Sequence, residues 1–128
     1  MLRAFVKQFL LIYCFRFFFF VIEKPIFSID VHQECLKFAT GGQGADSGRV
    51  VIWNLMPVLS EKAELDEAVP KMLCQMDNHL ACVNCVRWSQ SGLMLASCSD
   101  DKLVMIWMQS KVRFVSNCLG FNKFDNMF

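Results

Sequence analysis

Residues 83–107 read VNCVRWSQSGLMLASCSDDKLVMIW, and this segment carries the clearest signal for the fold. It holds three short runs rich in Val, Leu, Ile and Trp, which Ser, Gly and Asp residues separate. Such runs are typical of short strands joined by turns. A similar segment begins further upstream. Six positions agree in type at one constant offset: Ile26, Ile29, Val31, Phe38, Ala39 and Thr40 match Val83, Val86, Trp88, Leu95, Ala96 and Ser97.

The two segments also end alike, with Ile52-Trp53 in the first and Ile106-Trp107 in the second. The remaining difference in spacing falls in the glycine-rich stretch between Gly41 and Arg49, which we expect to be a long turn between strands. Internal repetition of this kind identifies a repeat architecture. A further apolar run, Met72 to Met76, follows a polar connector, so we expect three or four antiparallel strands per unit. The sequence predicts an all-β fold of propeller blades, about two of them, which form an incomplete ring.

The second unit resembles the WD-repeat family, because His79 precedes Leu95-Ala-Ser97, Asp101 and Ile106-Trp107 in that family's order. Met108 and Asn54 stand where these repeats usually have Asp. Within the family, four stretches resemble the first blades of the HIRA histone regulators: Lys24-Pro-Ile-Phe-Ser, Lys37-Phe-Ala-Thr-Gly-Gly-Gln-Gly, Val50-Val-Ile-Trp-Asn-Leu and the specific run from Lys71 to Ser89. The resemblance covers residues 24–107 and fails on either side.

The resemblance divides the chain into five parts: an atypical Phe-rich hydrophobic segment (1–22), a first WD repeat (23–55), an acidic connector (56–70), a closing strand with a second WD repeat (71–109) and a non-matching tail (110–128). It also implies a structural relay of hydrogen bonds in each blade. In the second unit the relay maps onto His79, Ser97, Asp101 and Trp107. In the first unit the counterparts are Thr40 and Trp53, with Asp46 as a further counterpart.

The same resemblance implies a nuclear, non-enzymatic subunit of a histone chaperone complex. Such proteins deposit a variant histone independently of DNA replication and repress transcription, including that of histone genes. The implied partners are ubinuclein-type subunits, with histones and chromatin reached through the complex, and no cofactor or small-molecule substrate. Two alternatives stay open: a WD-repeat scaffold of another complex, or a membrane-anchored protein if residues 9–22 form a genuine anchor.

Composition limits the alternatives. Thirteen Lys and Arg against twelve Asp and Glu exclude a strongly basic nucleic-acid binder, and 55% hydrophobic residues exclude intrinsic disorder. Seven cysteines, an odd number at irregular spacing, indicate free thiols in an intracellular protein rather than a disulfide framework. Residues 1–22 carry seven of the thirteen phenylalanines, but Arg16 interrupts the apolar run and no small-residue cleavage site follows. This segment is predicted to be foreign to the blade domain.

The remaining motifs do not match the patterns of a phosphate-binding loop, a zinc site or a hydrolytic active site. The glycine-rich stretch lacks the lysine of a phosphate loop and leads into a strand. His79, Cys82 and Cys85 cannot converge on zinc if residues 82–88 are extended. His79, Ser97 and Asp101 lack a nucleophile elbow, so we expect no catalysis. The acidic connector (Glu61, Glu64, Asp66 and Glu67 against Lys62) is interpreted as a solvated loop with one helical turn after Ser60.

An incomplete ring also has consequences for stability. Repeat units bury their faces against neighbours, so terminal blades leave apolar surface uncovered. We expect that surface to include Val86, Trp88 and Leu95. Burial contributes about 25 cal/mol per Å², so one open face forfeits several kcal/mol and favours aggregation of the isolated chain.

Overall fold

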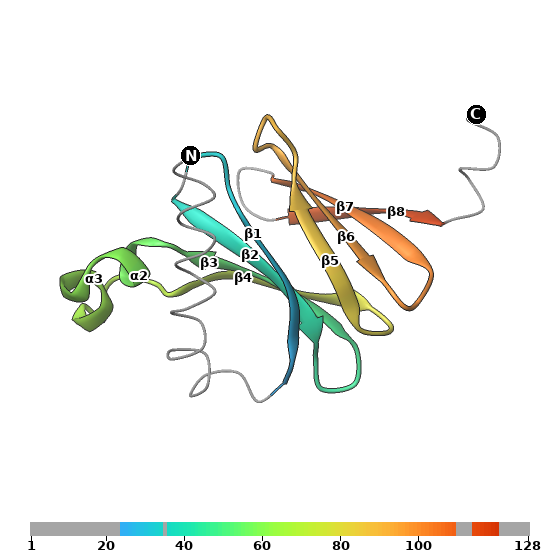
Figure 1. Ribbon diagram of the computed structural model, residues 1–128, viewed down its shortest axis with the longest axis horizontal. Coiled ribbons are helices and arrows are strands. Elements are labelled where there is room, and N and C mark those ends of the chain that lie inside the picture. The colour runs from blue at the N-terminus through green and yellow to red at the C-terminus, as the bar shows by residue number, and fades with distance from the viewer. Residues whose placement is uncertain (1–23, 35, 110–113, 121–128) are drawn as a thin grey trace.

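A computed structural model describes residues 24–34, 36–109 and 114–120. The strands form two four-stranded antiparallel sheets, each with its strands in chain order (Figure 1). Sheet A contains β1 (Ile26–Val31), β2 (Lys37–Gln43), β3 (Gly48–Asn54) and β4 (Met72–His79). Sheet B contains β5 (Val83–Trp88), β6 (Met94–Ser99), β7 (Leu103–Gln109) and β8 (Phe114–Gly120). The predicted all-β blades are confirmed.

The main core lies between the two sheets. On β5, every second residue from Val86 is buried while Arg87 is exposed, because successive side chains point to opposite faces of a strand. The register pairs Val86 with Ser97 and Trp88 with Leu95, so these residues share the face that packs on sheet A. The core cluster consists of ten buried residues from both sheets: Ala39, Val50, Ile52, Met76, Val83, Val86, Trp88, Leu95, Met105 and Trp107.

This packing corrects one expectation. Val86, Trp88 and Leu95 were expected on an uncovered face, but they are at most 5% exposed because sheet A covers them. The opposite face of sheet B carries apolar side chains that stay half-buried, namely those of Cys85, Ala96, Cys98, Val104 and Ile106. Strand alternation predicts that each blade has two faces, but it does not say which face meets the neighbour.

The glycine-rich stretch is shorter as a turn than the sequence suggests. β2 continues through Gly42 to Gln43 and pairs with β3, so the connection between the strands is only residues 44–47. A Cβ on Gly41 would lie 2.7 Å from Cγ1 of Val83 and 2.8 Å from Cγ1 of Val86. These glycines let the two sheets, and β1 beside β2, approach closely rather than forming a flexible loop.

Each sheet gains its fourth strand from outside the most clearly repeated segments. β4 follows the connector and pairs with β3, so the apolar run at Met72 closes the first blade. β8 pairs with β7 along its whole length and closes the second blade. The sequence predicted that the tail 110–128 does not continue the blade. The structure differs from this prediction at Phe114–Gly120, which forms a strand paired with β7.

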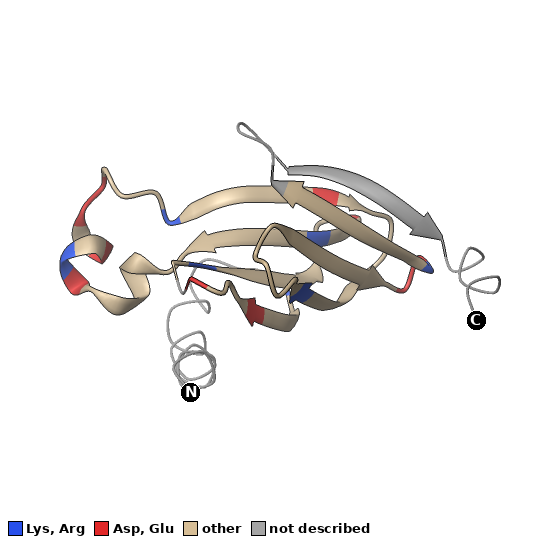
Figure 2. Cartoon of the chain, turned by 90° about the horizontal axis from the view of Figure 1, so that it is seen from above, with Lys and Arg blue, Asp and Glu red and all other residues tan. Residues whose placement is uncertain are grey.

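Two short helices form the connector between β3 and β4, at one end of sheet A (Figure 1). α2 (Met56–Leu59) was not predicted, whereas α3 (Glu61–Leu65) is the helical turn expected after Ser60. Ser60 Oγ accepts a hydrogen bond from the Ala63 N–H, which caps α3. Figure 2 shows charges of both signs gathered at this helical end.

No helix within the described residues has the length and apolar content needed to cross a membrane. The Phe-rich segment 1–22 lies outside the described residues, as does Cys35. The five-part division of the chain therefore stays a prediction. The strand assignments show only that the boundary between the two sheets falls between His79 and Val83.

Candidate functional site

Four buried polar side chains join the two blades. His79 ends β4 of sheet A, whereas Ser97 lies on β6, Trp107 on β7 and Asp101 in the turn between those strands. His79 Nδ1 lies 2.8 Å from Asp101 Oδ2, and His79 Nε2 lies 2.7 Å from Ser97 Oγ. Trp107 Nε1–H donates to the same Ser97 oxygen over 2.8 Å. The structure thus brings together all four residues proposed for the second relay.

The groups at the two ends of this network, an indole and a carboxylate, fix which atom donates in each of its hydrogen bonds. An indole N–H can only donate and a carboxylate can only accept. Ser97 Oγ accepts from Trp107, so its hydroxyl is free to donate to His79 Nε2. His79 then donates from Nδ1 to Asp101. This assignment gives each of the four side chains in the network a hydrogen-bond partner, as burial requires.

Asp101 holds the outer end of the network. Its Oδ2 also accepts the Leu80 N–H over 2.9 Å, and its Oδ1 accepts the Leu103 N–H over 2.9 Å. Burial raises the pKa of Asp101, but the hydrogen bond from His79 and those from the two backbone N–H groups outweigh it. The pKa of this carboxyl therefore lies below its ordinary value. Asp101 thus ties the loop after His79 to the β6–β7 turn in its ionised form.

The contacts Asp101–His79–Ser97 match those of a hydrolytic triad, but their surroundings differ from those of an active site. The His79 side chain is fully buried, and Ser97 is 1% exposed. Trp107 occupies one side of the Ser97 oxygen through its hydrogen bond. A nucleophile needs a free approach for its substrate, and this oxygen has none.

The first blade carries a shorter version of the same network. Trp53 Nε1–H on β3 donates to Thr40 Oγ1 on β2 over 2.9 Å. Asp46 lies exposed in the turn before β3, and none of the hydrogen bonds described here joins it to this pair. The position equivalent to His79 is Ile22, so the sequence offers no imidazole there.

A second set of contacts between the blades was missed in the sequence. β5 lies against β1, and two β1 side chains bind the backbone of β5: Asp30 Oδ2 accepts the Trp88 N–H over 2.8 Å, and Ser28 Oγ accepts the Val86 N–H over 3.1 Å. These N–H groups belong to an edge strand and would otherwise need water. The signal was present, since Ser28 and Asp30 alternate with buried Ile29 and Val31.

His32 continues this contact beyond the end of β1. Its Nε2 lies 2.9 Å from the carbonyl oxygen of Gly92, and its ring meets Trp88 edge-on at 4.8 Å between centroids. A Cβ on Gly92, whose φ is +75°, would lie 2.5 Å from that His32 nitrogen. The turn between β5 and β6 therefore needs glycine both for its backbone and for the imidazole packed against it.

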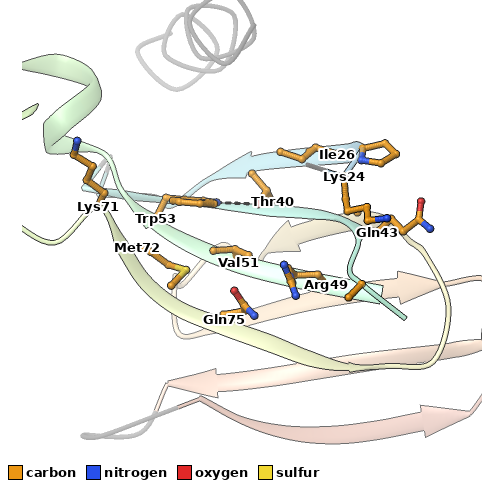
Figure 3. Close-up of a pocket in the computed structure, with 13 residues that line it drawn as sticks. Lys24, Ile26, Thr40, Gln43, Arg49, Val51, Trp53, Lys71, Met72 and Gln75 are labelled. Atoms are coloured by element: carbon orange, nitrogen blue, oxygen red, sulfur yellow. Dashed lines mark hydrogen bonds between the residues drawn. The ribbon is translucent and has the colours of Figure 1, made fainter. Parts of the chain in front are cut away.

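A cavity of about 550 Å³ opens on the face of sheet A that points away from sheet B (Figure 3). Trp53, Val51 and Met72 contribute apolar surface, and three cationic side chains also line it: Lys24, Arg49 and Lys71. Arg49 is already paired with Asp77, with 2.7 Å between Nε and Oδ1. In the repeat alignment Val51 and Trp53 correspond to Met105 and Trp107, which face sheet A. The cavity thus occupies a surface whose counterpart in the second blade packs against a sheet.

No group of three or more His, Cys, Asp or Glu residues within the described part of the chain could hold a metal ion. His79 is engaged with Asp101 and Ser97 rather than with Cys82 and Cys85. The glycine-rich turn leads from one strand into the next, without the helix amino terminus that a phosphate loop requires.

Comparison with known proteins identifies this architecture. Residues 70–108 match the family model described as WD domain, G-beta repeat. A Drosophila melanogaster protein named Protein HIRA homolog is 75% identical over 88 residues, which are 69% of this chain and 8% of the relative. The human Protein HIRA is 70% identical over 87 residues (68% and 9%). The Takifugu rubripes Protein HIRA is 63% identical over 105 residues (81% and 10%).

The two sheets and the matched repeat define a protein built from WD-repeat blades. The particular WD-repeat proteins that are its homologues carry the name HIRA. The chain spans about a tenth of the length of these relatives, so the activities and partners of whole HIRA proteins come to it only as proposals.

Proposed function

We propose that these blades act as a protein-interaction scaffold of a histone chaperone complex in the nucleus. The complex would assemble nucleosomes independently of DNA replication and repress transcription, including that of histone genes. The observation that carries this proposal is the 75% identity to the fly relative over 88 residues. Identity at that level preserves exposed positions as well as the core, and exposed positions form docking surfaces.

The role proposed for the blades is binding and not catalysis. The relays His79–Ser97–Asp101–Trp107 and Thr40–Trp53 would fix blade geometry, because a satisfied buried network rigidifies the elements it joins. Rigid strands then present loops and strand edges to partners. Ubinuclein-type subunits are the proposed direct partners, and histones and chromatin are reached through the complex.

A chimera tests this function. Residues 24–107 would replace the matching segment of the fly relative, and the tagged chimera would be purified from nuclear extract and probed for ubinuclein-type subunits. We expect recovery equal to that of the unaltered relative and enrichment at histone genes. A matched control would carry two blades from an unrelated WD-repeat protein in the same place. A chimera that melts like its parent yet loses the subunit would overturn the proposal.

A further inference from the structure

Two cysteines lie directly opposite each other in the second blade. Cys85 of β5 and Cys98 of β6 are Cα partners in the antiparallel register. Both are free thiols, and both are half-buried. The next pair along the strands, Val86 and Ser97, faces sheet A, so Cys85 and Cys98 share the opposite face of sheet B. The two thiols therefore project from neighbouring strands to the same side.

The hydrogen bonds of β5 show how far apart the two backbones are. The N–H groups of Val86 and Trp88 bind side chains of β1, so they point away from β6. The register shifts between Val83 and Cys85, and from Cys85 to Trp88 the pairing with β6 is continuous. Because N–H directions alternate along a strand, the N–H of Cys85, one residue before Val86, points toward β6. Opposed residues at such positions have Cα atoms about 5.5 Å apart. Disulfides span Cα separations of about 4.4–6.8 Å, a range that includes this spacing.

The electrostatics of Cys98 agree with the register, because Cys85 is among the groups that shift the pKa of the Cys98 thiol. Burial raises the pKa of the Cys98 thiol, and the Cys85 thiol raises it further through its charge and a side-chain hydrogen bond. Arg87, also on β5, acts in the opposite direction, and the β7 partner of Cys98 is the uncharged Val104. Cys98 is thus a weakly acidic thiol held beside Cys85.

The other described cysteines are not opposed to a cysteine across two strands, and Cys118 of β8 lies opposite Met105. Cys74 lies on β4, opposite Ile52. Cys82 precedes β5, and its carbonyl oxygen accepts the Asp100 N–H. Among the described residues, only Cys85 and Cys98 are cysteines opposed across two strands.

From this geometry we propose that Cys85 and Cys98 form a reversible cross-strand disulfide when the chain meets a peroxide. The Cys85 sulfur attacks one oxygen of the peroxide and becomes a sulfenic acid, and the proton that the Cys85 thiol gives up joins the departing hydroxide as the first water. The Cys98 sulfur then attacks the Cys85 sulfur, and the hydroxyl leaves with the Cys98 proton as the second water. Two thiols and one hydrogen peroxide thus give one disulfide and two water molecules, with the sulfurs oxidised and the peroxide reduced.

In a reducing compartment this disulfide would be transient, as intracellular disulfides usually are. While present, it would link β5 to β6 covalently on the face of sheet B that turns away from sheet A. The half-buried Ile106 and Val104 share that face, so oxidation would alter the surface available to a neighbouring sheet. The proposal does not depend on the proposed function, because the chemistry needs only the second blade.

The test is a peptide map of the full chain. Hydrogen peroxide treatment would be followed by alkylation of the remaining thiols in denaturant and digestion with trypsin. Trypsin cuts after Lys71, Arg87 and Lys102, so Cys98 is the only cysteine in its peptide, whereas Cys85 shares a peptide with Cys74 and Cys82. We expect these two peptides to be disulfide-linked after oxidation, lighter by two hydrogens, and to separate on treatment with a thiol reductant.

Serine variants identify the sulfur involved. Cys85→Ser should abolish the link, whereas the matched variants Cys74→Ser and Cys82→Ser should retain it. Cys98 that stays alkylatable after peroxide treatment of the unaltered chain would overturn the proposal, and this readout requires no variant to fold. A link that survives in Cys85→Ser, or that joins Cys98 to any other cysteine, would overturn it as well.

Discussion

Ser97 is the residue on which the second blade's network depends. Its single oxygen accepts from Trp107 and lies 2.7 Å from His79 Nε2, so one small side chain links β7 to the end of β4. Both neighbours are almost fully buried. Removing this oxygen would leave an indole N–H and an imidazole nitrogen without partners, and unsatisfied buried groups cost more than the bond itself contributes.

Truncation within the network should therefore destabilise the blade in a graded way. In the chimera described above, we expect Trp107→Ala to cost about 3–5 kcal/mol, as for other buried aromatic residues. Ser97→Ala and Asp101→Ala should each cost about 1–3 kcal/mol. Urea unfolding measures these values, with Asp100→Ala as a matched exposed control. A chimera unchanged by Trp107→Ala would show that the network does not support the blade.

Asp101 should also make stability depend on pH. Its pKa is lowered in the folded chain, so its contribution is present above the unfolded value, about 3.9. That contribution is lost as the pH falls through the lower folded pKa. The difference in urea midpoint between the parent chimera and Asp101→Asn should be constant above about pH 5 and shrink below about pH 4. Parallel curves down to the acid transition would contradict this assignment.

At the scale of elements, β1 and β5 meet through side chain to backbone contacts. Ser28 and Asp30 satisfy the edge of β5, and His32 holds the turn that follows it. The hydrogen bond from the Trp88 N–H offsets part of the cost of burying the Asp30 carboxylate. Sequence alternation placed these polar residues on one face of β1, but it could not show that the face meets another sheet.

Asp30→Ala should therefore weaken the docking of one blade on the next while leaving each sheet's own ladder intact. We expect a loss of about 1–3 kcal/mol, because the Trp88 N–H loses a charged acceptor. Amide hydrogen exchange of Trp88 is the specific measurement and should accelerate in the variant. Asp46→Ala, at an exposed turn position, serves as the control. Unchanged protection of Trp88 would mean that water replaces the carboxylate at no cost.

At the scale of the whole molecule, strand alternation determines which side chains lie on the face of sheet B that points away from sheet A. Ala96, Cys98, Val104 and Ile106 are half-buried on the face opposite sheet A. Contiguous apolar surface of this kind favours association. The side chains on this face therefore differ from the expected set of Val86, Trp88 and Leu95, which the first blade covers.

We expect the full chain to self-associate through this face. Ile106→Lys should shift sedimentation velocity profiles toward the monomer. Burial of apolar area stabilises an association by about 25 cal/mol per Å², and a charged side chain on this face opposes that burial. Leu93→Lys is the matched control, since Leu93 is already 69% exposed in a turn. If the unaltered chain sediments as a monomer at every concentration, the apolar face is not an association surface.

The local structure and the relay residues could be predicted from sequence pattern and family resemblance. Repetition at one offset predicted strands ending in Ile52-Trp53 and Ile106-Trp107, because alternation and turn residues are local signals. It also named His79, Ser97, Asp101 and Trp107 before their hydrogen bonds could be seen, through resemblance to repeats of known order. These inferences need only short-range pattern.

The contacts between the two blades could be seen only in the tertiary structure. His79 belongs to a strand of sheet A yet bonds to sheet B, and Gly41 leaves the space that Val83 of the other sheet occupies. Likewise, the packing of β1 on β5 brings the Asp30 carboxylate to the Trp88 N–H. These contacts join residues far apart in sequence, and a period of two leaves both faces of a strand equivalent until another sheet covers one of them.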